Sequence, residues 1–271
     1  MKKRALTISL AFLLSILFSA NVYAGSVAKI KRIDGTVSVL KKGAEKWRTA
    51  RVNMPLSEGD AVYSREESFA EIVYSSGAIL RMDEDTKILI KKVSEKKTKT
   101  ETPLGNVWAN MRKLVISKKE FELESPTATA AIRGTVFQMN TDKDSSTDVS
   151  VYEGKVAVGP SKKEEEKKPP QPEGRYEVPG PEEIPGPYEV SLEQWRTIVA
   201  GQMISINKEG KYSEKKFDMQ KASEDDFVKK NLELDKAVEK ESEKEGAKEE
   251  KKEIDNKKEE DKLDNKENEE Q

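Results

Sequence analysis

The sequence contains no cysteine and no histidine in 271 residues. Without cysteine there can be no disulfide, no thiolate metal site and no cysteine nucleophile. Without histidine, the usual general base, the usual zinc ligand and the usual switch near neutral pH are absent too. These absences favour a protein that binds over one that catalyses. We therefore expect no enzymatic activity, no metal and no cofactor.

Neither sign of charge is in large excess, because the formal net charge is only -2. The charges are nevertheless unevenly distributed. Residues 25–160 carry 23 positive and 19 negative side chains, whereas residues 161–271 carry 23 positive and 32 negative ones. A near-neutral central region has no strong electrostatic attraction for nucleic acid. We therefore expect no nucleic-acid partner.

Residues 1–24 have the features of a secretion signal. Basic residues at positions 2–4 precede an apolar stretch over 5–20, and small residues suited to signal peptidase end at Ala24. The apolar stretch is shorter than the roughly 20 residues that a membrane-spanning helix needs. We expect cleavage after Ala24, a periplasmic or secreted mature protein, and no membrane span after cleavage.

Short runs of alternating apolar and polar residues fill the chain from about residue 26 to residue 158. Ala70, Ile72 and Tyr74 are an example, and turn residues separate each run from the next. No long stripe of period 3.6 interrupts them. This pattern predicts an all-β fold, either an antiparallel sandwich or a rolled, solenoid-like β domain.

The second half of the chain changes character twice. Eight of the 11 prolines lie between Pro160 and Pro187, which predicts an extended loop. Strand-like alternation then returns, Ser223 and three following acids predict a helix start, and the Lys/Glu-rich end predicts disorder. The predicted organisation is a signal peptide (1–24), a β domain (25–159), a Pro-rich charged loop (160–189), returning strands of the same domain (190–222), a short helix (223–238) and a disordered tail (239–271).

Six segments of the β region resemble, in the same order, the conserved pieces of the FecR domain family. The most specific runs from Glu124 to Phe137 and is similar to the family pattern T-P-x-A-x-A-x-R-G-T-x-F. The other matching segments are Ile33–Leu40, Leu56–Val62, Ala70–Ile72 with Ser76–Arg81, Leu104–Val107 and Val149–Val156.

The resemblance implies an extracytoplasmic all-β domain. In the regulators that give the family its name, this domain lies in the periplasm and relays a signal between an outer-membrane transporter and a cytoplasmic sigma factor. Those regulators carry a cytoplasmic segment and a membrane helix before the domain, whereas only residues 1–4 precede the hydrophobic run here. We therefore expect the family's fold and compartment, and not its sigma-regulating role.

The motif residues are interpreted mainly as structural. Arg133 could be a recognition residue. We expect it instead to bond nearby carbonyls or a carboxylate, next to Gly134, where a close approach of the backbone requires glycine. We expect Trp47 to fill the core, since an indole buries a large area. The full set of motif residues is Trp47, Gly59, Asp60, Gly77, Arg133, Gly134, Thr135, Phe137, Glu153 and Gly154.

Three functions remain open. The leading hypothesis is an extracytoplasmic binding or scaffolding module that engages another envelope protein, with a possible role in signalling. The alternative is a protein that binds cell-wall or surface polysaccharide through Trp108, Trp195 or exposed tyrosines. The least favoured is a hydrolase that uses paired carboxylates, for which no residue can be named.

Overall fold

The computed structural model describes residues 26–114, 119–161 and 195–240. Several expectations from the sequence fall outside the described residues. They are the signal peptide, nearly all of the proline-rich loop, the strand expected around Val190 and Leu192, and the tail from residue 241 onward.

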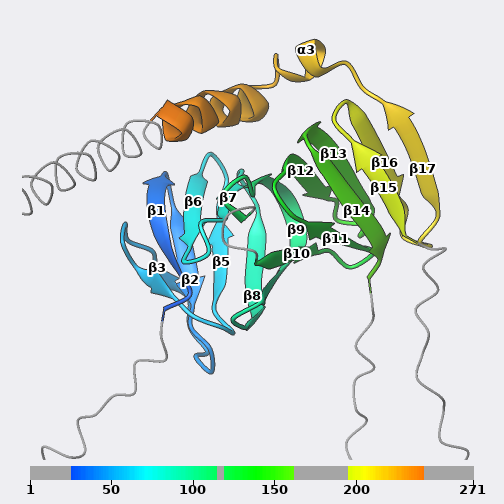
Figure 1. The fold of residues 1–271 in the computed structure, drawn as a ribbon. Helices are drawn as coiled ribbons and strands as arrows, with labels where there is room; N and C mark the ends of the chain where they lie inside the picture. The colour runs from blue at the N-terminus through cyan, green and yellow to red at the C-terminus, as the bar shows by residue number, and fades with distance from the viewer. Residues whose placement is uncertain (1–25, 115–118, 162–194, 241–271) are drawn as a thin grey trace, which may run out of the picture.

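Strands dominate the described part of the chain (Figure 1). In the first half they are β1 (Ala28–Asp34), β2 (Val37–Leu40), β3 (Arg48–Thr49), β4 (Pro55–Leu56), β5 (Ala61–Ser64), β6 (Phe69–Tyr74), β7 (Ile79–Met82), β8 (Lys87–Val93) and β9 (Lys97–Asn110). In the second half they are β10 (Glu120–Glu124), β11 (Ala128–Ile132), β12 (Val136–Thr141), β13 (Thr147–Glu153), β14 (Lys155–Pro160), β15 (Arg196–Val199), β16 (Gln202–Ile206) and β17 (Tyr212–Lys216).

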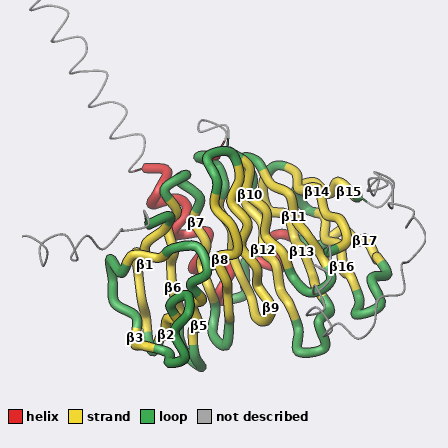
Figure 2. The backbone as a smooth tube through the Cα atoms, turned by 90° about the horizontal axis from the view of Figure 1, so that it is seen from below, coloured by secondary structure: helices red, strands yellow, loops and turns green. Residues whose placement is uncertain are grey.

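These strands form one hydrogen-bonded sheet that folds back on itself as two layers (Figures 1 and 2). The first layer has the order β4-β1-β6-β7-β9-β12-β13-β16-β17. The second layer has the order β3-β2-β5-β8-β9-β10-β11-β14-β15. Neighbouring strands are antiparallel in every one of these pairs except β9 and β10, which run parallel.

Strand β9 belongs to both layers. Its first part pairs with β8 and β10, and the part from Gly105 onward pairs with β12 and then β7. Gly105 has a φ of +96°, and a Cβ there would lie 2.5 Å from the Cα of Thr86. Glycine is the residue that tolerates both the left-handed backbone and this close approach. The position therefore allows the strand to leave one layer and enter the other.

The apolar residues of the alternating runs meet between the two layers. In β13, Val149 and Val151 are fully buried while Ser150 and Tyr152 face outward in part. The same period of two buries one side of nearly every strand, so both inner faces contribute to one main core. The predicted all-β, sandwich-like fold is confirmed.

The strands after residue 195 complete both layers. Strand β15 pairs with β14, with Arg196 opposite Val158, and β16 pairs with β13, with Ile204 opposite Val149. Ile204 is fully buried in the main core.

The C-terminal helical region differs from the prediction. Helix α3 (Met219–Ala222) is capped by Asp218 and ends at Ser223, so Ser223 does not begin a helix. A second helix occupies residues 226–240, beginning after Asp225, whose Oδ1 accepts the N–H of Val228 at 3.0 Å. The capping carboxylate lies two residues beyond the expected serine, since the serine hydroxyl instead bonds the carbonyl of Gln220. Residues 239–240, expected in the tail, are helical.

The helix of residues 226–240 lies across the outer side of the first layer (Figure 1). Within the described ranges, no helix is both long enough and apolar enough to span a bilayer.

Candidate functional site

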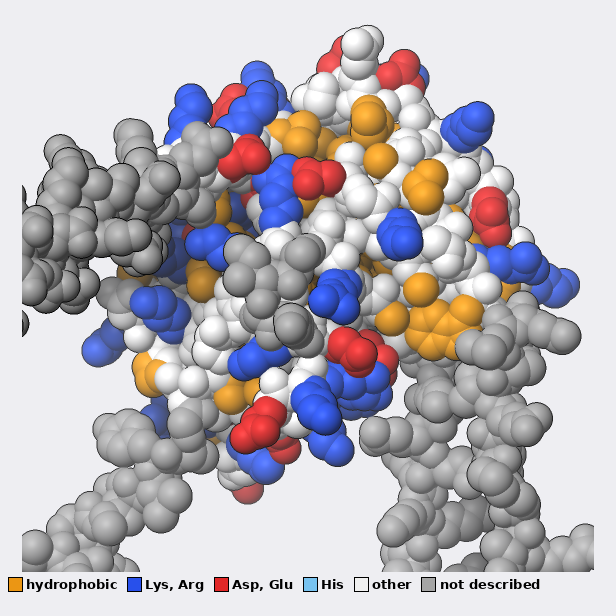
Figure 3. Space-filling view, viewed as in Figure 1, with side chains coloured by type: hydrophobic (Ala, Val, Ile, Leu, Met, Phe, Trp, Pro, Cys, Tyr) orange, Lys and Arg blue, Asp and Glu red, His pale blue; other side chains and the backbone are white. Residues whose placement is uncertain are grey.

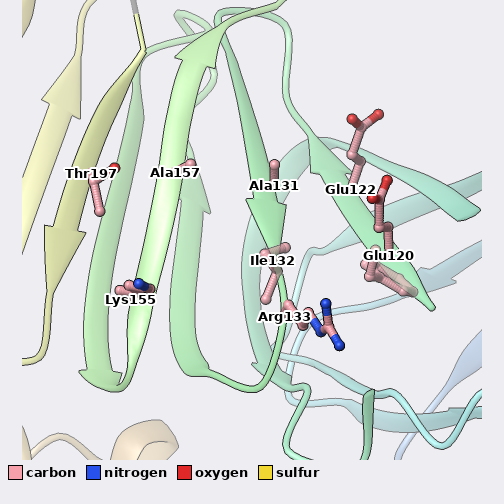
Figure 4. A pocket seen from close by; sticks show the side chains of 9 residues that line it. Glu120, Glu122, Ala131, Ile132, Arg133, Lys155, Ala157 and Thr197 are labelled. Atoms are coloured by element: carbon pink, nitrogen blue, oxygen red, sulfur yellow. The ribbon is translucent and has the colours of Figure 1, made fainter. Parts of the chain in front are cut away.

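The outer face of the second layer carries a pocket where β10, β11, β14 and β15 lie side by side (Figure 4). The register places Glu122 beside Ala131, Ala131 beside Ala157, and Ala157 beside Thr197. The two alanines leave the middle of this row low, so the longer side chains around them border a pocket of about 340 Å³. Its lining residues are Glu120, Phe121, Glu122, Ala131, Ile132, Arg133, Lys155, Ala157 and Thr197.

Two cations lie at the same end of this pocket, Arg133 after β11 and Lys155 at the start of β14 (Figure 4). Both are exposed. Neither side chain makes an ion pair or a hydrogen bond with any residue that the structure describes. A guanidinium offers five N–H donors in a planar fork that matches a carboxylate. The pocket therefore presents to an incoming group two cations that have no partner among the described residues.

The acidic side of the pocket is already partly neutralised. Glu122 pairs with Lys97 and with Lys99, whose Nζ lies 3.2 Å from Oε2 of Glu122. Burial lowers the pKa of Lys99, but its hydrogen bonds to Glu124 and Glu122 outweigh burial and leave that pKa above its ordinary value. Lys99 therefore stays charged, and Glu122 is paired with two lysines.

The backbone of the most specific motif turns at Gly134, which has a φ of +71°. Gly154, with a φ of +78°, packs against this turn: a Cβ there would lie 2.9 Å from Cγ2 of Thr135 and 3.1 Å from the carbonyl oxygen of Gly134. Thr135 is buried, and its carbonyl accepts the N–H of Met111 at 2.8 Å. The two motif glycines, distant in sequence, thus meet at one close backbone contact.

Glu153 and Phe137 flank this contact in different ways. The Nε of Arg112 donates to Oε2 of Glu153 at 2.8 Å, and this bond raises the pKa of Arg112. Phe137 is fully buried in the main core. Arg112 is a residue that the sequence motifs did not single out.

The structure differs from the sequence interpretation at Arg133. Its side chain was expected to bond nearby carbonyls or a carboxylate, but it is exposed and lines the pocket. The reason is local: β11 ends at Ile132, which points into the core, and the chain then turns at Gly134. Alternation therefore directs the side chain at 133 to the outer face.

Trp47 is also placed differently, because it is 38% exposed and does not fill the core. It precedes the two-residue edge strand β3, and its ring meets Tyr63 edge-on with centroids 6.2 Å apart. The Nζ of Lys87 lies 5.8 Å from the Trp47 ring centroid. The indole packs along the outer surface of the edge of the second layer, where neighbouring side chains cover it only in part.

The remaining motif residues lie in turns. Asp60 is buried, and its carboxylate accepts the N–H groups of Ser57 at 2.8 Å and Lys42 at 3.0 Å, with the Nζ of Lys41 at 2.7 Å. Gly59, just before it, has a φ of +89°. Gly77 has a φ of +88° in the turn between β6 and β7, and its N–H bonds the carbonyl of Tyr74 at 2.9 Å.

A cluster that sequence reasoning missed lies on the opposite face, beneath the helix of residues 226–240. Arg81 bonds Glu71 and Asp235, and the indole of Trp108 also donates to Asp235. Alternation marks Glu71, Arg81 and Trp108 as outward-facing, but nothing in their strands indicates that Asp235 covers them. Trp108 is fully buried, so the buried indole offers no surface for the sugar binding considered above.

Figure 3 shows the surface from the same side as Figure 1. Lys and Arg side chains are interspersed with Asp and Glu, and hydrophobic side chains gather in small groups. No group of three or more metal-ligating side chains could hold an ion within the described ranges.

Comparison with known proteins gives a match to one family model, described as FecR protein, over residues 60–157. Two crystal structures of a candidate anti-sigma factor from Parabacteroides distasonis ATCC 8503, at 1.65 Å and 2.50 Å resolution, are also similar to this chain. Each has 17% sequence identity and a TM-score of 0.41, and the match covers 60% of this chain and 62% of that one. No curated protein matches the chain.

Proposed function

Since a family model described as FecR protein matches residues 60–157 of this chain, we propose that the protein is a non-enzymatic binding module that engages another envelope protein outside the cytoplasm. The partner contacts the pocket on the outer face of the second layer. A role in signalling fits such a module, with the FecR domain as the receiving surface.

One observation carries this proposal: Arg133 belongs to the most specific family motif, yet the fold leaves its side chain without a partner among the described residues. An arginine that supports a fold is normally paired or stacked, because its five donors are then satisfied. Exposed at the rim of a pocket and unpaired within the described ranges, Arg133 is instead available to a ligand. Lys155 adds a second cation at the same end (Figure 4).

The chemistry of the pocket indicates what part of a partner would bind. Arg133 favours a carboxylate, which it can hold through two parallel N–H bonds. The low row of Ala131 and Ala157 lets a backbone approach the strands closely, because no long side chain stands in the way. An extended segment of a protein, with an acidic side chain over Arg133, fits both features.

The compartment is part of the proposal. The motivation is the secretion signal expected in residues 1–24, which lie outside the described residues. Intact mass of the protein recovered from the cell envelope tests it: a mature chain beginning at Gly25 is expected. A species that retains Met1 would contradict export by cleavage.

The binding proposal is tested with the full chain as bait against envelope extract, comparing Arg133→Ala with Arg51→Ala. Arg51 is also exposed but lies in the first half of the chain, away from the pocket. We expect Arg133→Ala to weaken capture of the partner by about tenfold or more, since losing a charge-assisted pair costs about 1.5–3 kcal/mol. Arg51→Ala should leave capture unchanged.

The melting temperature separates recognition from folding in this experiment. Both variants should melt within experimental error of the unmodified protein, because exposed substitutions usually change stability by less than about 0.5 kcal/mol. If Arg133→Ala lowers the melting temperature while capture per folded molecule is unchanged, Arg133 is structural and the proposal fails.

A further inference from the structure

The outer face of the second layer continues past the pocket toward an indole. In β11 and β14, Thr129 is paired with Gly159. This pair lies two residues along both strands from Ala131 and Ala157, which form the low part of the pocket. The residue before β15 is Trp195, and its ring lies over Gly159. The same two strands therefore have the cations of the pocket at one end and an aromatic ring at the other.

The contact at Gly159 shows how the indole lies on the sheet. A Cβ at position 159 would lie 2.6 Å from both Cδ2 and Cε2 of Trp195, and 3.0 Å from Cε3. Cδ2 and Cε2 form the bond that the two rings of the indole share, so an atom equally close to both lies over the face of the ring and not at its edge. Gly159 thus lies under one face of the indole, and a larger residue there would push the ring off the sheet.

The other face of this indole points away from the sheet. Trp195 is partly exposed, and no ring or cation in the part of the chain that the structure describes stacks on it. Trp108, by comparison, is fully buried, and the Nζ of Lys87 approaches the ring of Trp47. Among the described residues, Trp195 is therefore a tryptophan with a supported inner face and an outer face that a ligand can reach.

The opposite end of the two strands carries an excess of positive charge. Arg133 and Lys155 are exposed there and make no ion pair with a described residue (Figure 4). Glu120, which also lines the pocket, is likewise exposed and unpaired in the described ranges, whereas Glu122 is held by two lysines. Two cations against one such carboxylate favour an anionic group in the ligand.

The distance between the two ends fits a short stretch of extended polypeptide. Lys155 and Gly159 are four residues apart in β14, which corresponds to about 13 Å along a strand. A chain in the polyproline II conformation rises about 3.1 Å per residue. About four of its residues therefore separate a group held by the cations from a group on the indole.

The strands between the two ends have no unpaired edge. Strand β11 pairs with both β10 and β14, and β14 pairs with both β11 and β15. A ligand on this face consequently cannot join the sheet as a further strand, and side chains must recognise it. Polyproline II suits such a surface, because it needs no backbone hydrogen bonds, and its prolines bind aromatic side chains with little loss of entropy.

The low part of the pocket also favours a polypeptide over an acidic glycan. A sugar chain presents many hydroxyl groups, and each needs a hydrogen-bond partner where it is desolvated. Ala131 and Ala157 offer no polar side-chain atom, and the backbone groups beneath them are used in the sheet. A proline ring has no donor to satisfy on this surface.

We infer that the partner segment is a proline-containing stretch with an acidic residue about four positions from the proline. Arg133 and Lys155 hold its acid, and its proline packs on the outer face of Trp195. This inference rests on the proposed function, and it adds Trp195 as a residue that determines specificity and a spacing that the partner must satisfy.

The inference is tested with the full chain and labelled synthetic peptides of serine and glutamine that contain one glutamate and one proline. In one pair of peptides the two residues have the inferred spacing, in either order. In a matched pair of the same composition they are adjacent. We expect one peptide with the inferred spacing to bind at least about tenfold more tightly than the adjacent pair, because both contacts form together only when the spacing fits.

Variants of the chain then assign the proline contact. Trp195→Ala should weaken binding of the better peptide by about tenfold, since an aromatic anchor is lost. It should not change the binding of the same peptide with alanine in place of its proline. Trp47→Ala is the matched control, because Trp47 is also partly exposed but precedes β3 at the other edge of the layer, and it should bind like the unmodified chain. If Trp195→Ala fails to fold, Trp195→Leu keeps an apolar cover over Gly159 and should show the same loss.

Four results would overturn the inference. The first is equal binding of the two spacings, and the second is a loss in Trp195→Ala that does not depend on the proline. The third is the absence of binding by every peptide at millimolar concentration. The fourth is binding of an oligogalacturonate that requires Trp195 while the peptides do not bind, because the ligand would then be a sugar.

Arg133→Ala separates this inference from the proposed function. It should weaken both the capture of the envelope partner and the binding of the better peptide. If Arg133→Ala reduces capture while Trp195→Ala and the peptide spacing have no effect, this inference fails and the proposed function stands. If Arg133→Ala leaves capture unchanged, the proposed function fails as well.

Discussion

The two outer faces of the sandwich arise from the same alternation of side chains but serve different ends. On the first layer, Arg81 is fully buried and pairs with Glu71 and Asp235 under a helix. On the second layer, Arg133 is exposed at the rim of a pocket and has no partner among the described residues.

The difference teaches that the strand pattern does not decide what an outward arginine does. Each of these residues follows or lies within a short strand and points away from the core. What separates them is a segment far along the chain: the helix of residues 226–240 covers one face, and no described element covers the other. The role of such a residue is therefore set by long-range packing.

The largest loss of stability is expected from Arg81→Ala, on the outer face of the first layer that the helix of residues 226–240 covers (the closed face). The substitution leaves Glu71 and Asp235 buried without their cation, and removing one partner from a buried pair typically costs about 3–5 kcal/mol. Denaturant unfolding of the full chain should show this loss. Arg112→Ala is the control, because Arg112 and Glu153 form a partly exposed pair and such pairs contribute about 0–1 kcal/mol. Equal losses for both variants would show that burial of the Arg81 network does not matter.

Gly105→Ala should affect both faces, since β9 belongs to both layers. The left-handed φ of +96° disfavours any L side chain by about 1–2 kcal/mol. Displacing Thr86, whose Cα would lie 2.5 Å from the new Cβ, adds about 1–3 kcal/mol. Gly210 has a similar φ of +79°, but a Cβ there would meet nothing within 4 Å. Gly210→Ala should therefore lose only the stability that the left-handed backbone conformation costs. Thermal melting of the two variants compares them, and a smaller loss at 105 than at 210 would contradict the close approach.

The smallest expected effect is a loss of stability at alkaline pH, at the edge of the closed face. Burial, followed by the nearby charge of Asp225, raises the pKa of Tyr152 to about 12. The folded state thus holds the phenol proton more tightly than the unfolded state, whose tyrosine has its ordinary pKa near 10. The stability that this group contributes is therefore fully present below about pH 10 and is lost as the pH rises through about 12.

Alkaline unfolding of the unmodified chain and of Tyr152→Phe checks this sign. The phenylalanine variant should lose less stability between those pH values, and the difference in tyrosinate absorbance should place the missing titration above the ordinary range. Identical pH profiles would mean that the fold does not raise the pKa of Tyr152.

The fold was largely predictable because the signal is local. Runs such as Ala70, Ile72 and Tyr74 alternate with a period of two, and the structure buries them between two layers. The start of the helix of residues 226–240 was harder to predict from the sequence. Ser223 and the acids after it offered several possible caps, and only tertiary packing of Phe227 and Val228 selects Asp225.

The site was predictable in its residues but not in its arrangement. The motif drew attention to Arg133, yet sequence alone could not show that β10 and β14 lie on either side of β11 or that Lys155 shares its pocket. The network at Arg81 was missed because Asp235 lies more than a hundred positions from both Arg81 and Trp108 in the sequence. The prediction that Trp47 fills the core was wrong. The large surface of an indole favours burial only where neighbouring elements lie over it, and Trp47 lies beside an edge strand.

The connection between strands β14 and β15 is a suitable place for an inserted domain. Val158 and Arg196 are direct neighbours in the sheet, so the connection between the two strands begins and ends at one place. Doubling the length of such a connection costs only about 0.6 kcal/mol. The protein should therefore accept an inserted reporter domain there without redesign of its interior. Because both strands border the pocket at Arg133, a fluorophore carried on that insertion would make the protein a sensor of its own occupancy.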